Sequence, residues 1–301
     1  MSGDYQLVQL ASGAKTLFSA SYGEKMHPGL GPAAEADLLY VRQLKICERM
    51  QNGAGEFVIW DVGLGGAANA IALLRATREI SGQLLIVSFD NTAEPLAFAL
   101  QHARALEYPA GYEHPMGELL EKKSVAWQNG NSLVHWEFQL GDFPAWLQTL
   151  KGGRAPAPPH AIFYDAFSPA KNPAMWTLPV FEALFRTLDP ARPCALTTYS
   201  RSTLVRATLL LAGFYVGAGH ATGQKEETTI AANTMSLLAE PLGQRWLERA
   251  LRSDSAEPLG EPVYTRAALL PATANRLRQH PQLISAPQSP VPPGRSQGSG
   301  S

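Results

Sequence analysis

Four short segments carry residues that could bind a nucleotide-like ligand and act on it. The first is Asp61-Val62-Gly63-Leu64-Gly65-Gly66, which follows a short apolar run. Glycines allow the backbone to approach a ligand closely, and a helix that starts after them offers free N–H groups to it. The spacing Gly63-x-Gly65-x-x-Ala68 also fits the dinucleotide fingerprint, so the motif alone indicates a nucleotide-like ligand without selecting the cofactor.

Two acidic residues stand at the ends of later apolar runs. Asp90 ends the run 84–89, where a carboxylate can accept hydrogen bonds from ribose hydroxyls, and Asn91 follows it. Asp142 lies in Gly141-Asp142-Phe143, where it would face an adenine edge with Phe143 as an apolar wall. An equally good interpretation makes Asp142 the N-cap of the next helix. The predicted ligand-binding residues are therefore Asp61, Gly63, Gly65, Gly66, Asp90, Asn91, Asp142, Phe143 and Asp165.

The most specific segment is residues 164–176, Tyr-Asp-Ala-Phe-Ser-Pro-Ala-Lys-Asn-Pro-Ala-Met-Trp. It begins where a fourth strand should end, which is where open α/β sheets bind ligands. Asp165 would place a carboxylate beside the reacting group, and Phe167 and Trp176 offer flat surfaces for a stacked base. The two prolines restrict the loop. A structural loop with its aromatic residues in the core is the alternative.

Positioning these residues requires a sheet whose strand ends meet at one edge. Asn129-Gly130 between two strand-like runs predicts a hairpin. The expected helices are 34–50, 67–80, 93–106, 116–122, 142–150, 180–188, 202–212 and 242–253. The expected strands are 57–60, 84–89, 124–128, 133–140, 160–164, 194–199, 214–218 and 228–232.

The alternation of strands and helices predicts an α/β fold with a doubly wound, Rossmann-like sheet. The last two strands have no helix between them, which indicates an antiparallel pair at the edge. We therefore expect the mostly parallel, seven-stranded sheet with an antiparallel last strand that class I S-adenosylmethionine-dependent methyltransferases have. The expected organisation is an N-terminal capping segment at 1–55, a methyltransferase domain at 56–253, an extension at 254–285 and a disordered tail at 286–301.

Composition limits the classes of partner. Hydrophobic residues make up 45% of the 301 residues and charged residues 17%, with a net charge of −1. Nucleic acid would thus require a local basic patch. Cys47 and Cys194 form neither a disulfide framework nor a metal-binding spacing. The chain has no apolar run of roughly 18 residues and no leader pattern, so we expect a cytoplasmic protein without a membrane span or a metal.

Residues 165–176 resemble the signature loop of the MnmC methyltransferase-domain family, which methylates the amine of 5-aminomethyl-2-thiouridine in tRNA. Related features run from about Leu17 to about Ser253, including Thr197-Thr198-Tyr199-Ser200 and Ala212-Gly213-Phe214. The resemblance implies S-adenosyl-L-methionine as cofactor and tRNA as partner. Two-domain members add a C-terminal flavin oxidase, and the length of this chain resembles the stand-alone methyltransferase form.

Two segments depart from the family pattern. Residues 223–227, Gly-Gln-Lys-Glu-Glu, replace a basic stretch, and residues 22–27, Tyr-Gly-Glu-Lys-Met-His, differ from the tRNA enzymes. The roles of Glu24, His27 and Glu35 stay open, as does the oligomeric state.

The expected mechanism is methyl transfer to an amine. Asp165 would orient the ammonium form of the acceptor and accept or relay its proton. Phe167, Asn172 and Trp176 would shape the acceptor pocket. The expected phosphate contacts are Lys171, Arg201, Arg206 and Lys225.

Other functions compete with this one. A methyltransferase or an aminopropyltransferase-like enzyme could act on a small amine, although the chain lacks the four-glycine loop around an Asp that aminopropyltransferases have. A non-catalytic RNA-binding protein with a nucleotide fold is a second alternative. The final antiparallel pair argues against an NAD-dependent oxidoreductase.

Overall fold

The computed structural model describes residues 3–53, 55–150, 156–221 and 227–284. Its centre is an eight-stranded sheet. The strands are β4 Glu56–Val62, β5 Gly82–Asp90, β6 Ser124–Asn129, β7 Ser132–Leu140, β8 Ala161–Tyr164, β9 Ala195–Thr198, β10 Tyr215–Gly219 and β11 Thr228–Ala232. They lie in the order β10-β11-β9-β8-β4-β5-β7-β6. The run from β9 through β8, β4 and β5 to β7 is parallel, and β11 is antiparallel to both β9 and β10.

This arrangement confirms the predicted fold class and contains the eight strands expected along the chain. Beyond the seven-stranded sheet of the class, the sheet includes β6, which pairs antiparallel with β7 through the predicted hairpin and forms an edge. Gly130 in its turn has a φ of 60°, and a Cβ there would lie 2.4 Å from the carbonyl oxygen of Arg78. Only glycine therefore fits this turn without displacing the chain beside it.

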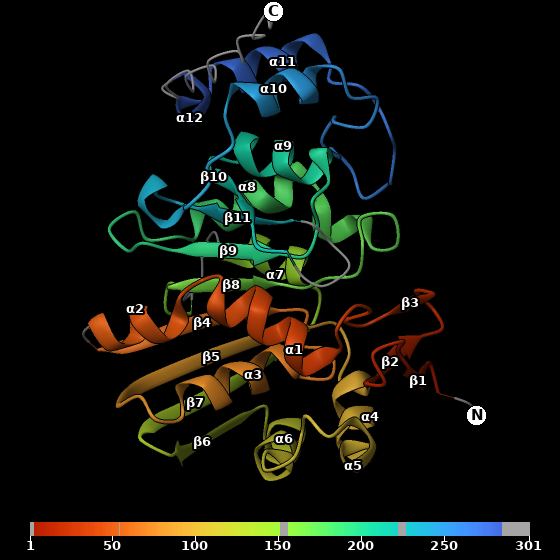
Figure 1. Cartoon of the computed structure of the whole chain (residues 1–301), viewed down its shortest axis with the longest axis vertical. Coiled ribbons are helices and arrows are strands. Elements are labelled where there is room, and N and C mark those ends of the chain that lie inside the picture. Colours follow the sequence, from red (N-terminus) through yellow and green to blue (C-terminus); the bar gives the residue numbers. More distant parts are fainter. Residues whose placement is uncertain (1–2, 54, 151–155, 222–226, 285–301) are drawn as a thin grey trace, which may run out of the picture.

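Helices cover both faces of the sheet (Figure 1). They are α1 Pro32–Ala36, α2 Ile46–Asn52, α3 Ala68–Thr77, α4 Glu94–Gln101, α5 Ala103–Leu106, α6 Glu113–Lys122, α7 Phe143–Thr149, α8 Leu178–Arg186, α9 Thr203–Leu211, α10 Gln244–Leu251, α11 Pro271–Arg278 and α12 Pro281–Ile284. Alternate residues of β4 point to opposite sides: Ile59 joins the core under α1, α2 and α3, and Trp60 joins the core under α7, α8 and α9. In the described part of the chain, no helix has the length and apolarity needed to cross a bilayer.

The N-terminal segment differs most from the prediction. Strands β1 Tyr5–Gln9, β2 Lys15–Ser19 and β3 Glu24–Lys25 form a separate antiparallel sheet, which lies beside α4 (Figure 1). The single helix expected at 34–50 is wrong. It is broken into α1, a π-helical turn at Asp37–Arg42, and α2, because Lys45 adopts a left-handed φ of 50°.

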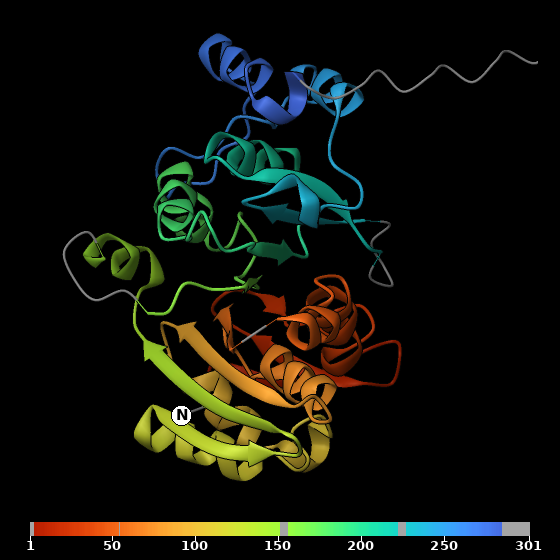
Figure 2. The same ribbon diagram turned by 90° about the vertical axis from the view of Figure 1, so that its left-hand side faces the viewer.

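The chain after β11 continues through α10, α11 and α12, which gather at the β10 end of the main sheet (Figure 2, blue). Gln282 of α12 is buried and hydrogen bonds to both the N–H and the carbonyl oxygen of Val216 in β10. The tail expected at 286–301 lies outside the described residues, as does Lys225.

Candidate functional site

A cavity of about 590 Å³ opens at the carboxyl ends of β4, β5, β7 and β8. Its volume is within the range of roughly 300–1,000 Å³ that small-molecule sites occupy. The main sheet contributes four strand-end segments to its lining: residues 62–66, 89–91, 141–143 and 165–168. The predicted convergence of these strand ends is thus present in the fold.

The glycine loop after β4 is compact and tightly constrained. Gly63 has a φ of 94°, and a Cβ there would lie 2.7 Å from the carbonyl oxygen of Asp165. A Cβ on Gly66 would lie 2.5 Å from the hydroxyl of Tyr108, which donates a 2.7 Å hydrogen bond to the Gly66 carbonyl. Because Gly63 and Gly66 have no side chains, the loop can lie close to the end of β8 and to Tyr108. The backbone of the loop lines the cavity.

Asp90 and Asp142 fix the backbone around the cavity. The Gly65 N–H donates to Asp90 Oδ2 at 2.9 Å, and the Thr92 N–H donates to Oδ1 at 3.3 Å. Burial raises the pKa of Asp90, and these backbone hydrogen bonds partly offset it. Asp142 accepts from the Ala145 N–H at 2.7 Å and so caps α7, while it also lines the cavity. The two interpretations of Asp142 are therefore compatible.

Asp61 is fully buried near the end of β4 and is not among the residues that line the cavity. It accepts a 2.9 Å hydrogen bond from Ser88, whose hydroxyl in turn accepts from the indole N–H of Trp136. Burial raises the pKa of Asp61 to about 8. Asn91 lines the cavity, and Phe143 lines it and packs against Phe89 with ring centroids 5.0 Å apart.

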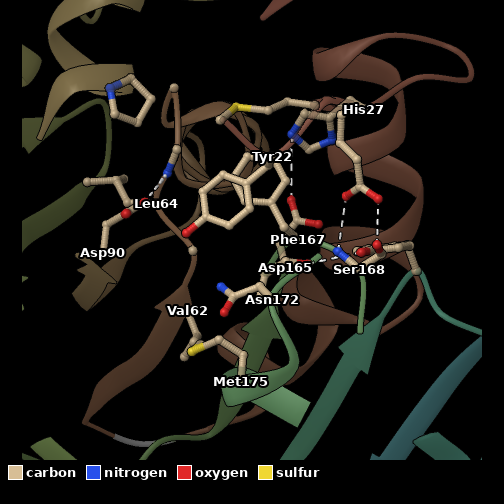
Figure 3. Close-up of a pocket in the computed structure, with 18 of the residues that line it drawn as sticks. Tyr22, His27, Val62, Leu64, Asp90, Asp165, Phe167, Ser168, Asn172 and Met175 are labelled. Atoms are coloured by element: carbon tan, nitrogen blue, oxygen red, sulfur yellow. Dashed lines mark hydrogen bonds and ion pairs between the residues drawn. The ribbon is translucent and has the colours of Figure 1, made fainter. Parts of the chain in front are cut away.

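Asp165 is the first residue after β8, and it lies beside the glycine loop (Figure 3). Its backbone N–H donates to the Val62 carbonyl at 2.9 Å, which extends the strand pairing. Its Oδ2 accepts a 2.8 Å hydrogen bond from the Asn69 amide and lies 3.6 Å from Nε2 of His27. This carboxylate is 16% exposed, so a ligand in the cavity can reach it.

The N-terminal sheet and the segment after it complete the site. The rings of Tyr22 and Phe167 are stacked with centroids 4.1 Å apart. Glu24 accepts hydrogen bonds from both the N–H and the hydroxyl of Ser168. Glu35 accepts from the N–H groups of Gly29 and Gly31 and fixes the turn between β3 and α1. These contacts give Glu24 and Glu35 positioning roles, which no local pattern in the sequence indicated.

The predicted acceptor residues separate into two groups. Phe167 and Asn172 line the cavity. Trp176 does not, because it is fully buried beneath the loop, where its indole N–H donates to the Phe167 carbonyl. It therefore supports the loop, and it offers no surface to a base. The cavity is also lined by residues that were not predicted to belong to the site, among them Tyr22, Met26, Met175 and Tyr199.

Of the predicted phosphate contacts, the three that the structure describes lie outside the cavity. Lys171 and Arg201 are exposed and do not line it. The prediction for Arg206 is wrong, because its side chain is 3% exposed and engages Glu227 at 3.0 Å and the Thr228 carbonyl at 2.8 Å. A guanidinium that is buried and paired in this way joins α9 to β11 and cannot reach RNA.

Residues 119–234 match the family model described as S-adenosyl-L-methionine-dependent methyltransferase. The bifunctional protein MnmC for tRNA 5-methylaminomethyl-2-thiouridine biosynthesis from Methylibium petroleiphilum is 29% identical over 255 residues, which cover 79% of this chain and 36% of the relative. The same protein from Ralstonia nicotianae is 31% identical over 231 residues, covering 72% and 33%. The solved structure of MnmC2 from Aquifex aeolicus superimposes with a TM-score of 0.65 at 26% identity, over 86% of this chain and 79% of that one. The chain belongs to the MnmC-like S-adenosyl-L-methionine-dependent methyltransferases.

The family assignment confirms the resemblance found in the sequence. This methyltransferase chain spans about a third of the length of the curated relatives that it matches. Spermidine synthase from Thermotoga maritima superimposes with a TM-score of 0.51 at 11% identity, over 91% of this chain and 83% of that one. At that identity the likeness concerns the fold alone, so it does not favour an aminopropyl transfer.

Proposed function

We propose that this methyltransferase transfers a methyl group from S-adenosyl-L-methionine to an amine. We further propose that the amine is the 5-aminomethyl group of a modified wobble uridine in tRNA. The observation that carries the proposal is the position of Asp165. Its carboxylate lines the cavity beside the glycine loop, with the stacked rings of Tyr22 and Phe167 at the same wall. A cytoplasmic location, where such tRNAs are modified, belongs to the same proposal.

The residues present fit the cofactor. A Cβ on Gly63 would collide with the residue after β8, so only glycine fits at this position. The loop thereby exposes its backbone to a ligand in the cavity. We assign the cofactor to Gly63, Gly65, Gly66, Asp90, Asn91, Asp142 and Phe143. Asp61 is buried in β4 just before the loop and accepts a hydrogen bond from Ser88 of β5. When bound, S-adenosyl-L-methionine supplies an electrophilic methyl group on a sulfonium.

The acceptor half of the cavity suits a flat, positively charged group. An alkylamine reaches the enzyme largely as ammonium, and a carboxylate such as Asp165 attracts and orients that charge. Phe167 and Tyr22 present aromatic faces of the kind on which nucleobases stack. Exposed Lys171 and Arg201 are our proposed contacts to phosphates, together with Lys225, which lies outside the described residues.

The test is transfer of a tritiated methyl group to two tRNA preparations, one carrying 5-aminomethyluridine derivatives and one unmodified. We expect label only in the first, and nucleoside mass spectrometry should show one added methyl on the aminomethyl group. Polyamines serve as a third acceptor in the same assay. Label in polyamines but in neither tRNA would contradict the tRNA acceptor, and no transfer to any amine would contradict the activity itself.

A further inference from the structure

The imidazole of His27, from the N-terminal segment, faces the carboxylate of Asp165 (Figure 3). Its Nε2 lies 3.6 Å from Oδ2 of Asp165, and the side chain is 11% exposed. The backbone at His27 has a φ of 48°, a left-handed conformation that is unfavourable for most residues other than glycine. Such conformations persist where the surrounding structure enforces them, and they cluster at functional sites.

The structure holds His27 in this conformation through the residue before it. The Met26 N–H donates to the Leu17 carbonyl at 2.8 Å, and the hydroxyl of Thr16 donates to the Met26 carbonyl. The sulfur of Met26 would lie 3.3 Å from a Cβ on Gly65, so this residue packs against the glycine loop. The imidazole is thus fixed relative to both the proposed cofactor site and Asp165.

The other carboxylates around the cavity are already engaged by hydrogen-bond donors of the protein. Their partners are Ser168 for Glu24, Gly29 for Glu35, Gly65 for Asp90 and Ala145 for Asp142. The remaining titratable groups that line it are the phenols of Tyr5, Tyr22 and Tyr199 and the ammonium of Lys25. A neutral phenol or an ammonium has no basic site for a proton at neutral pH. Asp165 also accepts a hydrogen bond, from Asn69, but its carboxylate lies beside the imidazole of His27, so an amine in the cavity can contact this pair.

We propose that His27 is the base that takes the proton from the acceptor ammonium, while Asp165 holds and orients it. This inference rests on the proposed methyl transfer to an amine and assigns its proton. An imidazole is a stronger base than a carboxylate, so the proton of the ammonium should transfer to His27 and not to Asp165. The hydrogen bond from Asn69 to Asp165 suits a carboxylate that stays charged throughout.

The geometry allows one nitrogen to contact both groups. Because Nε2 and Oδ2 are 3.6 Å apart, less than two hydrogen-bond lengths of about 2.9 Å each, an amine nitrogen to one side of the line that joins them can contact both. The ammonium first gives a proton to Nε2, which leaves a free amine and an imidazolium. The amine lone pair then forms the new N–C bond, the C–S bond breaks, and sulfur keeps its electron pair. The product is a secondary ammonium, and the imidazolium returns its proton to solvent.

The decisive variant is His27→Asn, because asparagine tolerates the left-handed backbone and cannot accept the proton. At neutral pH we expect the methyl-transfer rate in a single turnover to fall about a hundredfold, within the range for loss of a general base. The deficit should shrink as pH rises, because more of the acceptor then arrives as free amine. His135→Asn is the matched control and should leave the rate unchanged, because His135 lies within β7, beside the edge strand β6, and does not line the cavity.

Two further measurements separate a chemical role from a structural one. His27→Gly keeps the backbone conformation and removes the ring, so added imidazole should restore part of its rate. In the wild-type protein with S-adenosylhomocysteine, ¹⁵N NMR should show the His27 ring gaining a proton when aminomethyl-bearing tRNA binds, and not when unmodified tRNA binds.

A loss in His27→Asn that is the same at every pH, without rescue of His27→Gly by imidazole, would overturn the assignment of His27. Full activity of His27→Asn would overturn it as well. In both cases the wild-type transfer would stand. Absence of transfer by the wild-type protein would instead contradict the proposed function.

Discussion

The rings of Tyr22 and Phe167 lie in a stacked arrangement, 4.1 Å apart and 17° from parallel. One ring comes from the turn between β2 and β3, and the other from the loop after β8. Together with the hydrogen bonds from Ser168 to Glu24, this stack attaches the N-terminal sheet to the loop that carries Asp165. The N-terminal segment is therefore part of the acceptor side of the cavity.

This arrangement predicts that Tyr22→Ala weakens acceptor binding. An aromatic pair contributes about 0.5–1.5 kcal/mol beyond its buried area, so the KM for tRNA should rise up to about tenfold. Tyr22→Phe keeps the stack and should behave as the wild type. Steady-state kinetics with saturating S-adenosyl-L-methionine measure the effect. An unchanged KM in Tyr22→Ala would exclude the stack from acceptor binding.

Asp90→Ala tests the cofactor side. The variant loses a charged acceptor for ribose hydroxyls and also releases the Gly65 N–H. We expect S-adenosylhomocysteine to bind about 1.5–3 kcal/mol more weakly by calorimetry, the range for losing a hydrogen bond to a charged group. Asp142→Asn is the comparison, since the amide oxygen can still accept from the Ala145 N–H and the affinity should change less. Equal affinity of a folded Asp90→Ala protein and the wild type would refute the assignment.

Asp165→Asn tests the chemistry. The amide keeps the size of the side chain and an oxygen that can accept from Asn69, but it loses the charge that holds an ammonium. Cofactor affinity and melting temperature should be unchanged, while methyl transfer falls about a hundredfold. Near-normal turnover would remove Asp165 from the mechanism, whereas a parallel loss of stability would indicate a role in supporting the loop.

The cofactor half of the site could be predicted because its signals are local. A short apolar strand followed by glycines or an acid, as at Gly63 and Asp90, places polar groups at a strand end, and parallel strands bring these ends together. Asp142 showed the limit of this logic, since one local pattern fits both a helix cap and a ligand contact.

The acceptor half could not be predicted in the same way. The contacts of Tyr22 with Phe167 and of Glu24 with Ser168 join segments about 144 residues apart, and hydrophobic periodicity carries no information on such pairs. Trp176 was misplaced for a related reason, because aromatic residues in a loop fit a core position and a stacking surface equally well until the packing is known. The break at Lys45 is likewise set by tertiary packing, which overrides helix propensity.

Asp61 predicts a specific dependence of stability on pH. Its pKa is raised to about 8 by burial, whereas an aspartate in an unfolded chain titrates near roughly 4. Between these values the folded protein holds a proton that the unfolded chain has released. The contribution of Asp61 to the free energy of unfolding is therefore complete below about pH 4 and falls by up to about 1.4 kcal/mol per pH unit as pH rises toward 8.

Asp61→Asn removes this dependence because the amide does not titrate. Urea unfolding at pH 5 and pH 7 should show that the wild type loses more stability over this interval than the variant does. Other groups titrate equally in both proteins, so the difference isolates Asp61. Parallel losses in the two proteins would mean that Asp61 is already charged at pH 5 in the folded state.

Gln282 predicts that the C-terminal extension stabilises the main sheet. Its side-chain amide donates to the carbonyl oxygens of Val216 at 2.6 Å and Leu242 at 2.8 Å, and its Oε1 accepts from the Val216 N–H at 2.7 Å. The segment 240–242 already pairs with the outer edge of β10, and the amide of Gln282 adds hydrogen bonds there to a backbone edge that would otherwise be less completely paired.

Gln282→Ala removes the hydrogen-bond partner of the Val216 N–H and of the Leu242 carbonyl, while the Val216 carbonyl still accepts from the Leu242 N–H. We expect the free energy of unfolding to fall by about 2–4 kcal/mol. Gln279→Ala is the matched control, because that side chain is exposed nearby in the chain and its loss should change stability by less than about 0.5 kcal/mol. Urea unfolding measures the stability of both variants. Calorimetry with S-adenosylhomocysteine should give the wild-type affinity for each, since α12 lies at the end of the sheet remote from β4 and β5.

If Gln282→Ala were as stable as Gln279→Ala, the hydrogen bonds of Gln282 would not contribute to the stability of the sheet. A loss of cofactor affinity in a folded Gln282→Ala protein would instead show that the β10 edge influences the site through the sheet.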